Sequence, residues 1–183
     1  MKIDYEQLRV RKLNPAEHIA SFDCGDEDLN SFILEEAPLY RKALLAVTYV
    51  VEDSESGKVL AYFSLANDKV SLSDFESKTK FNRFRKHRFV NEKRLRSYPA
   101  GKLCRLAVDN AAKNLHIGSN LIRFIKRYFI TDNKTGCRFL TVDAYADAIP
   151  FYLKNGFIPL NEDDAGQATR LLFFDLNDIA GTE

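Results

Sequence analysis

The succession of a strand, a polar turn and a helix between Ala100 and Phe129 constrains the fold of this chain more than any other feature. The run AGKLCRLAVD is largely apolar and has the length of a buried strand. The polar turn AAKNLH follows it, and IGSNLIRFIKRYF has the apolar spacing of an amphipathic helix. The first turn of a helix leaves backbone amides unpaired beside the positive end of the helix dipole, so this helix start can bind the phosphates of a nucleotide.

Further strands and helices are expected on both sides of this unit. Alternating, β-branched and aromatic residues predict strands, and Gly57 predicts the turn of a hairpin. Pro38 is expected to break or kink the helix that begins near Asp26, because proline removes a helical hydrogen bond. The expected order around the central unit is strand 8–13, helix 26–37, strands 46–53 and 58–68, then strand 137–145, helix 146–157 and strand 169–176. This order predicts a mixed α/β or α+β domain.

Length and composition predict one globular domain over residues 1–183, because 183 residues with 45% hydrophobic residues can bury a single core. The formal charge of +1 gives the whole chain no general attraction for nucleic acid or membranes. No apolar run is long enough to span a bilayer and the amino terminus lacks a secretory signal, so we expect a cytoplasmic location. Cys24, Cys104 and Cys137 lie far apart without metal-ligand spacing, which predicts reduced thiols and no metal.

Two segments carry motifs of a known family. The turn gives KNLHIG up to Gly118, and the segment ADAIPFYLKNGF has Ala, Phe-Tyr and Gly-Phe at the spacing A-x-x-F-Y-x-x-x-G-F. Together they resemble the GNAT (GCN-related N-acetyltransferase) superfamily, in which R/Q-x-x-G-x-G/A follows a strand and the second motif lies on the fourth helix. The chain departs from the family pattern at three positions, where Lys113 replaces Arg or Gln, His116 replaces the first glycine, and Tyr145 replaces a frequent asparagine.

The resemblance implies an α/β GNAT-like fold with a mixed, mostly antiparallel sheet, which is flanked by helices and splayed between its fourth and fifth strands. It also implies acetyl-CoA as co-substrate, with the pantetheine arm along the fourth strand and the diphosphate on the loop amides. Because these donors belong to the backbone, His116 obstructs them only if it enters the phosphate path or requires a forbidden φ. The implied cofactor-binding residues are Leu106, Ala107, Val108, Lys113, Asn114, Leu115, His116, Ile117, Gly118 and Ser119.

Tyr152 stands where the family places its catalytic acid. In the implied reaction an amine attacks the thioester carbonyl, and the departing thiolate needs a proton or a hydrogen bond. A phenol with a pKa of about 10 stays protonated at neutral pH and can supply either. The alternative is a tyrosine that only packs against the sheet. Asp68 and Asp143 are the acids nearest the expected cleft, but neither is assigned as a general base, because each suits a turn or a strand end.

The amino-terminal run FDCGDEDLNSFI, together with RLAVD before the loop, resembles one branch of the family. It is similar to the toxin-type enzymes of bacterial toxin–antitoxin pairs, which carry F-x-x-G-x-x-x-L-(D/N)-x-(F/W)-(L/I) and acetylate the amino group of aminoacyl-tRNA. The matching residues are Phe22, Gly25, Leu29, Asn30 and Phe32. This resemblance implies charged tRNA as acceptor and an antitoxin protein as partner. A homodimer is implied by analogy with the family.

A basic tract from Ser77 to Arg96 lies in an insertion at about 71–98. It contains nine Lys or Arg residues and one acid, Glu92, with three interleaved phenylalanines. Clustered cations and exposed aromatic rings would suit an RNA-bound acceptor. The alternative is an inserted helix whose phenylalanines enter the core while its cations face water. The candidate RNA contacts are Arg83, Arg85, Lys86 and Arg88.

Three functions therefore remain open from the sequence. The first is an acetyl-CoA-dependent N-acetyltransferase that acts on charged tRNA as a toxin. The second is the same chemistry on a protein or small-molecule amine. The third is a GNAT-like module that binds CoA or RNA without catalysis, which the changes at His116 and Tyr145 suggest and the presence of Tyr152 argues against.

Overall fold

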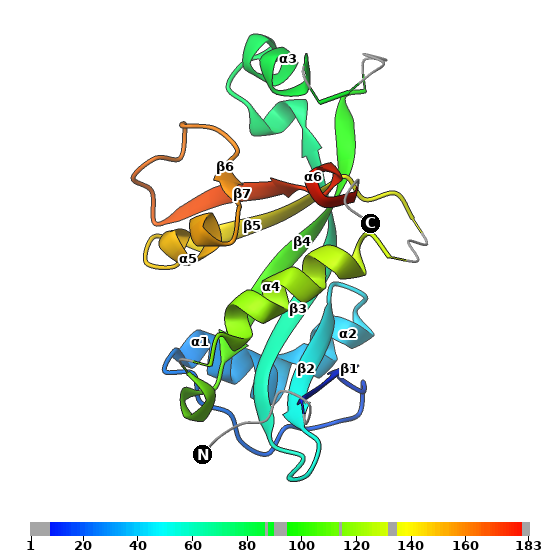
Figure 1. Cartoon of the computed structure of the whole chain (residues 1–183), viewed down its shortest axis with the longest axis vertical. Helices are drawn as coiled ribbons and strands as arrows, with labels where there is room; N and C mark the ends of the chain where they lie inside the picture. Colours follow the sequence, from blue (N-terminus) through cyan, green and yellow to red (C-terminus); the bar gives the residue numbers. More distant parts are fainter. Residues whose placement is uncertain (1–7, 87, 90–94, 114, 132–134, 181–183) are drawn as a thin grey trace. The chain divides into compact units, whose positions relative to one another are not determined.

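The structure is a computed structural model that describes residues 8–86, 88–89, 95–113, 115–131 and 135–180. Its seven strands form one sheet in the order β1-β2-β3-β4-β5-β7-β6 (Figure 1). The neighbours β1/β2, β2/β3, β5/β7 and β6/β7 are antiparallel, whereas β4 and β5 are parallel. The predicted mixed, mostly antiparallel α/β sheet is therefore confirmed. The strands are β1 Leu8–Lys12, β2 Val47–Asp53, β3 Val59–Ser71, β4 Ser97–Val108, β5 Phe139–Tyr145, β6 Ile158–Pro159 and β7 Thr169–Asp175.

Strand β4 separates from β5 after a short paired stretch. Ala100, Gly101 and Lys102 pair with Phe139, Leu140 and Thr141, although β4 continues to Val108 and β5 to Tyr145. This is the splay that was expected between the fourth and fifth strands. A parallel pair that ends early leaves backbone donors and acceptors of both strands available to another extended chain.

Contacts within the chain define two compact units, which are residues 1–66 with 103–125, and residues 67–102 with 126–183. Strands β3 and β4 each contribute residues to both units. The expectation of a single domain over 1–183 therefore stays a prediction. The helical elements are α1 Glu27–Ser31, η2 Phe32–Glu36, α2 Ala37–Lys42, η3 Leu72–Asp74, α3 Lys78–Lys86, η4 Asn110–Ala112, α4 Ile117–Tyr128, α5 Ile149–Lys154 and α6 Asn177–Ala180.

In the first unit, α1, η2 and α2 form one helical run that packs on β2 and β3. Phe32, Val50, Tyr62 and Ala107 are buried together in its core. Pro38 does not end the helix as a simple break. The amide of Ala37 donates to the carbonyl of Phe32, so a π-helical turn precedes the proline. The wider turn accommodates the proline ring, and the run continues to Lys42.

In the second unit, the core lies around Phe139 and Phe173 on β5 and β7. Val70, Phe84 and Tyr98 pack against them from the insertion and its flanking strands. Strand β3 runs to Ser71 and β4 begins at Ser97, so both strands extend further toward the insertion than the sequence indicates. The insertion is therefore anchored by the sheet itself.

Candidate functional site

The predicted phosphate loop lies in the first unit, between β4 and α4. The buried carboxylate of Asp109 accepts a hydrogen bond from the amide of Ala111 (2.9 Å) and fixes the turn that leaves the strand. Asn120 donates its amide to the carbonyl of His116 (3.0 Å), which is the first helical hydrogen bond of α4. The amides of 117–119 therefore precede the hydrogen-bonded ladder, as a phosphate-binding helix start requires.

His116 adopts a backbone conformation that glycine adopts without strain. Its φ is +53°, and its side chain is exposed. This left-handed region costs an L-residue about 1 kcal/mol. The loop therefore keeps the shape of a glycine loop although it carries a histidine, so the backbone does not exclude phosphate binding.

We expect His116→Gly to raise the free energy of unfolding by about 0.5 to 1 kcal/mol, because glycine occupies positive φ without strain. His116→Ala is the matched control, since it removes the imidazole and keeps the strain. Chemical denaturation of the three proteins would measure this order. A glycine variant less stable than the alanine variant would show that the left-handed conformation is not the source of the cost.

The other predicted cofactor residues lie in the same unit. Ala107 and Ile117 are buried, Leu106, Val108, Leu115, Gly118 and Ser119 are half-buried, and Lys113 is exposed. Asn114 lies outside the described residues. The buried helix residues Ile117, Leu121, Ile122 and Ile125 hold α4 in the core, and this packing positions the helix start.

The amino-terminal toxin-type element is hydrogen-bonded directly to this loop. The amide of Asp23 donates to Asp109 (3.1 Å), and the amide of Asn110 donates to the carbonyl of Asp23 (2.7 Å). Asn30 closes the element by donating to Asp23 (3.0 Å) and accepting from the amide of Cys24 (2.9 Å). Gly25 has a φ of +85°, which explains the glycine of the pattern. Local sequence spacing gave no signal of this contact.

Asp23 should make the stability of the first unit depend on pH. The amide of Gly25, and then the side chains of Asn30 and Asn110, lower the pKa of Asp23 below its ordinary value of 3.8. A carboxyl with a lowered pKa stabilises the fold at neutral pH, and this contribution is lost as the pH falls through the lowered pKa. Asp23→Asn replaces one acceptor oxygen with a donor. It should therefore lower the midpoint of thermal unfolding at pH 7.

The destabilisation caused by Asp23→Asn should shrink below about pH 4, where the carboxylate of the unsubstituted chain becomes protonated in the unfolded state. Thermal unfolding of both proteins from pH 7 to pH 3 measures this difference, with Asp147→Asn at an exposed acid as control. A difference that stays constant with pH would remove the ionised carboxylate as its cause.

Tyr152 lies in the second unit, on the short helix α5. Its ring is buried at 6% exposure and packs edge-on against Phe151 (5.1 Å) and Phe157 (5.5 Å). Burial raises the pKa of the Tyr152 phenol to about 12, which keeps it protonated at neutral pH. Its hydroxyl has no hydrogen-bond partner among the described residues, and no described side-chain polar atom is both buried and unpaired. The hydroxyl therefore reaches the surface and can donate to a ligand.

The two acids that were left unassigned both have partners on the second unit's sheet. Thr141 donates to the carboxylate of Asp68, which lies inside β3 rather than at its end. Asp143 is half-exposed and forms an ion pair with Lys102 (2.5 Å) at the last paired residue of β4. Neither contact identifies a general base, and an α-amine with a pKa near 8 is partly neutral without one.

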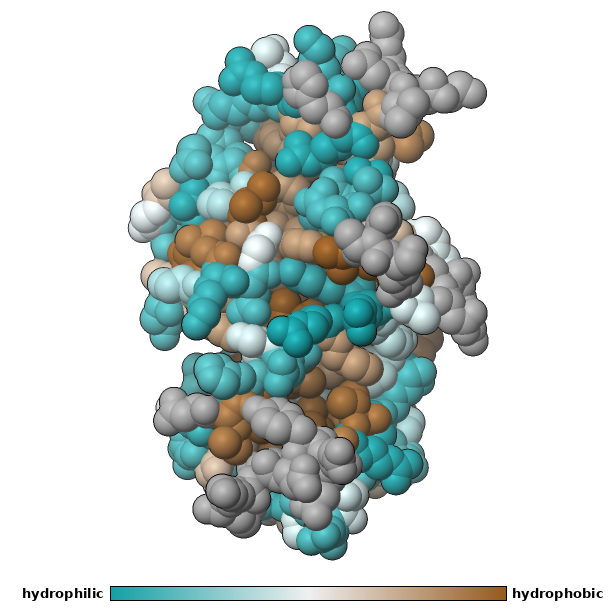
Figure 2. All heavy atoms as spheres, in the orientation of Figure 1, coloured by the Kyte–Doolittle hydropathy of each residue, from teal (hydrophilic) through white to brown (hydrophobic). Residues whose placement is uncertain are grey.

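Helix α3 carries Lys78–Lys86 of the basic tract, and His87 and residues 90–94 lie outside the described residues. Phe81 and Phe84 are buried in the second core. The helix therefore packs an apolar face against the sheet and exposes a charged face to water, which was the alternative to exposed aromatic rings. Hydrophilic residues cover the surface around α3 at the top of Figure 2. The exposed side chains include Lys78, Arg83 and Lys86.

Two of the four candidate RNA contacts have structural roles. Arg88 lies 4.5 Å from the ring centroid of Phe84 and pairs with the buried Asp175 (3.6 Å). Arg85 lies over Phe81 (5.4 Å) and donates to the carbonyl of Leu95 (3.3 Å). Arg83 and Lys86 therefore present the most accessible charges of the four.

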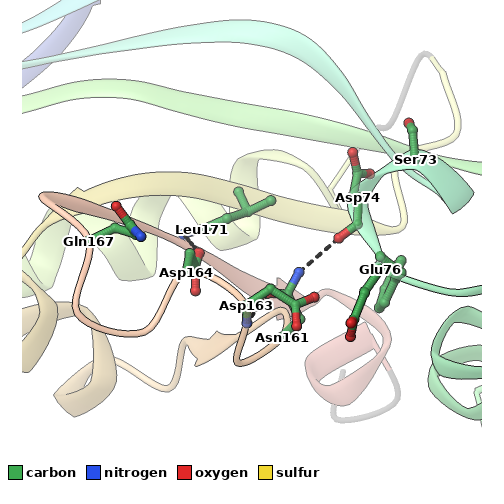
Figure 3. A pocket seen from close by; sticks show the side chains of 9 residues that line it. Ser73, Asp74, Glu76, Asn161, Asp163, Asp164, Gln167 and Leu171 are labelled. Atoms are coloured by element: carbon green, nitrogen blue, oxygen red, sulfur yellow. Dashed lines mark hydrogen bonds between the residues drawn. The ribbon is translucent and has the colours of Figure 1, made fainter.

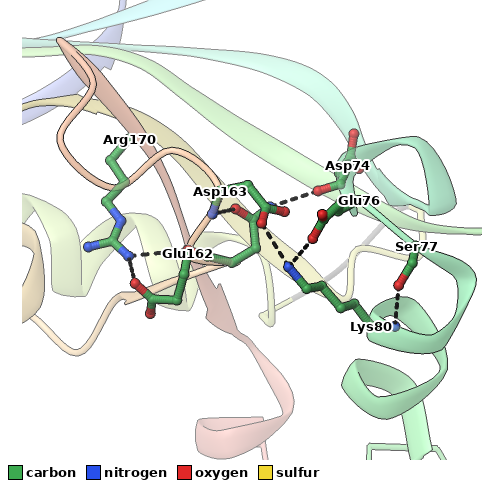
Figure 4. A network of polar contacts seen from close by, with 8 residues as sticks. Asp74, Glu76, Ser77, Lys80, Glu162, Asp163 and Arg170 are labelled. Carbon is green, nitrogen blue, oxygen red and sulfur yellow. Dashed lines mark hydrogen bonds and ion pairs between the residues drawn. The ribbon is translucent and has the colours of Figure 1, made fainter.

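A pocket of about 770 Å³ lies beside the start of α3 in the second unit, and none of the predicted cofactor residues lines it (Figure 3). Its four carboxylates already have partners. Lys80 pairs with Glu76 and Asp163 (Figure 4). Asp74 accepts from the amide of Ser71, and Asp164 accepts from the amide of Leu171 and the side chain of Arg170. The network neutralises one of the helix cations, so Lys80 contributes less than Arg83 or Lys86 to the exposed positive charge.

Within the described ranges, no helix is both long and apolar enough to cross a membrane, and no group of three or more His, Cys, Asp or Glu residues could hold a metal ion. The three cysteines, all within those ranges, form no disulfide and are half-buried.

Comparison with known proteins gives one family match, over part of the chain. Residues 79–159 match the acetyltransferase (GNAT) domain model. This match covers the segment that holds both motifs, and it agrees with the resemblance to the GNAT superfamily that they indicated. Comparison of its sequence with curated proteins gives no match.

Solved structures similar in fold to nearly the whole chain include KacT and AtaT. The KacT Y145F mutant has a TM-score of 0.72 and 24% identity, over 97% of this chain and 99% of that chain. AtaT complexed with acetyl-methionyl-tRNAfMet has a TM-score of 0.70 and 24% identity, over 94% and 96%. AtaTR bound with acetyl-CoA has a TM-score of 0.70 and 23% identity, over 95% and 96%.

Proposed function

We propose that this chain is an acetyl-CoA-dependent N-acetyltransferase whose acceptor is the amino group of aminoacyl-tRNA. The observation that carries the transferase chemistry is the conformation of the loop before α4. His116 in this loop has a positive φ, and the three amides that follow it precede the first helical hydrogen bond of α4. Those amides would bind the diphosphate of acetyl-CoA. The backbone of Leu106, Ala107 and Val108 would pair with the pantetheine arm as an added strand does.

The chemistry assigned to the chain is one acyl transfer. The lone pair of the acceptor amine attacks the thioester carbonyl, an N–C bond forms, and the C–S bond breaks. Tyr152 would donate a hydrogen bond or its proton to the departing thiolate, and the amine loses its extra proton to solvent. The phenol suits this task because burial raises the pKa of Tyr152 to about 12 and its hydroxyl is unpaired among the described residues.

The acceptor is proposed from two independent supports. AtaT, which is similar in fold over nearly the whole chain, has been captured with acetyl-methionyl-tRNAfMet. In addition, α3 presents exposed cations on a chain of net charge +1, and these would attract a phosphate backbone. By the same analogy we propose a toxin function and a cytoplasmic location.

The proposed partners follow from the same relatives. AtaT has been solved bound to the C-terminus of the antitoxin AtaR, and KacTA has been solved with DNA. We therefore infer an antitoxin partner that would inhibit this chain, and a homodimer remains a proposal from the family.

Transfer of label from acetyl-labelled CoA tests the function. The purified chain is incubated with a pool of charged tRNA, with the same tRNA after deacylation, and with lysate proteins. We expect label that ribonuclease destroys and that requires the charged state. Label in protein or small amines would keep the transferase and exclude the tRNA acceptor, and no label in any fraction would exclude the enzyme.

A further inference from the structure

Arg105 on β4 has contacts that the proposed function does not explain. It belongs to the RLAVD run, directly before the residues expected along pantetheine, and its side chain is half-buried in the first unit. The carbon at the centre of its guanidinium lies 3.8 Å from the ring centroid of Phe32 and 5.4 Å from that of Tyr40. These two rings meet edge to face at 5.2 Å, so they form a corner that holds the guanidinium.

The corner is fixed by the core of the first unit. Phe32 is completely buried and stacks on Tyr62 at 6.0 Å, and the hydroxyl of Tyr62 donates to the carbonyl of Leu29 (2.7 Å). A cation on a fixed aromatic face is held by the ring quadrupole and loses little further side-chain entropy when it binds a ligand. The guanidinium of Arg105 is thus preorganised.

The other arginines that lie on aromatic rings show what Arg105 lacks. Arg88 and Arg138 both stack on rings and both pair with Asp175, whereas Arg85 donates to a backbone carbonyl. Arg105 has neither an ion pair nor a hydrogen-bond acceptor among the described residues. A guanidinium has five N–H donors in a rigid fork and does not lose its charge. Its donors face no protein acceptor there, so a ligand can fill them.

We propose that Arg105 binds a phosphate group of the acceptor and thereby positions the acceptor beside the acetyl-binding strand. A planar fork binds phosphate through two parallel hydrogen bonds, which lysine cannot reproduce. The acceptor's phosphodiester is favoured over the diphosphate of CoA because the loop amides already provide for that diphosphate. This inference rests on the proposed tRNA acceptor and names a contact to it on the first unit.

The test compares an acceptor that has no phosphate with one that carries phosphodiesters. One is an amino-acid ester of adenosine, which has no phosphate, and the other carries the same ester on a short RNA ending in CCA. Arg105→Gln should lower kcat/KM at least tenfold for the RNA ester and less than twofold for the adenosine ester. Arg105→Lys should show most of the same reduction for the RNA ester, because lysine cannot form the two parallel hydrogen bonds. Arg9→Gln at an exposed strand position should change neither value.

Equal losses on both esters would overturn the proposal and leave Arg105 as a structural residue. Weaker binding of acetyl-CoA to Arg105→Gln, measured by calorimetry, would overturn it by assigning the phosphate to the co-substrate.

A second readout does not depend on activity. Titration of inorganic phosphate should shift the side-chain Nε–H resonance of Arg105 in the unsubstituted protein, and Arg105→Gln should weaken binding of uncharged CCA-ending RNA. If RNA binding depends on Arg105 and no transfer occurs, the proposed function fails and the phosphate site stands. If neither phosphate nor RNA responds to Arg105, the site fails whatever the enzyme acetylates.

Discussion

Tyr152→Phe is expected to lower kcat by about 100-fold or more while the affinity for acetyl-CoA stays unchanged, because general acid catalysis contributes about 10² to 10⁴. The substitution removes only the hydroxyl. The ring keeps its edge contacts with Phe151 and Phe157, and the hydroxyl has no described hydrogen-bond partner to lose. Steady-state transfer gives kcat, calorimetry gives the affinity, and chemical denaturation should show little change in the free energy of unfolding.

Tyr145→Phe provides a matched control, because Tyr145 is a tyrosine of the same unit at 56% exposure and stands where the family often has asparagine. Its loss of a hydroxyl should leave kcat within about twofold. The pH profile adds a further check, since burial raises the pKa of Tyr152 to about 12 and transfer should show no decline from phenol ionisation up to about pH 10. Similar rates for Tyr152→Phe and the unsubstituted chain would remove Tyr152 from the chemistry.

The elements with a strong local pattern could be predicted from the sequence. Alternation and amphipathic spacing depend on each residue's own neighbours, so the sequence predicts β2, β5 and α4 close to their observed positions. The effect of Pro38 could not be predicted in the same way, because the sequence shows that proline lacks an amide hydrogen but does not show that a π-helical turn can accommodate its ring. The lengths of β3 and β4 were also underestimated. Their polar outer ends are fixed by the core beneath the insertion rather than by strand propensity.

The place of the phosphate loop could be predicted from the sequence, but the long-range contacts that hold the site together could not. The motif spacing places His116 at the glycine position, and its φ of +53° is a conformation that glycine adopts without strain. The hydrogen bond from Asp23 to Asp109 joins residues 86 positions apart, which no local pattern encodes. Likewise, only packing separates the buried Phe81 and Phe84 of α3 from aromatic rings that could stack on bases.

Reversal of the two most accessible cations of α3, Arg83→Glu with Lys86→Glu, is expected to lower kcat/KM for charged tRNA by about 100-fold. Each reversal replaces attraction for a phosphate by repulsion, and the loss should diminish as salt rises. The adenosine ester and acetyl-CoA should be used normally, because the change is confined to an exposed helix face. Transfer assays over a series of salt concentrations measure the effect, and the free energy of unfolding should be nearly unchanged.

Arg85 and Arg88 are left unchanged in this experiment, because their replacement would affect folding as well as RNA binding and the two effects could not be separated. Arg88 neutralises the buried Asp175, and a glutamate there would leave like charges together in the second core. Arg123→Glu with Arg127→Glu is the matched control, because it makes the same charge change on the exposed face of another helix. If the control lowers tRNA acetylation equally, total charge rather than α3 attracts the acceptor. If neither variant responds, the basic face is a solvated surface and the tRNA acceptor loses its support from this structure.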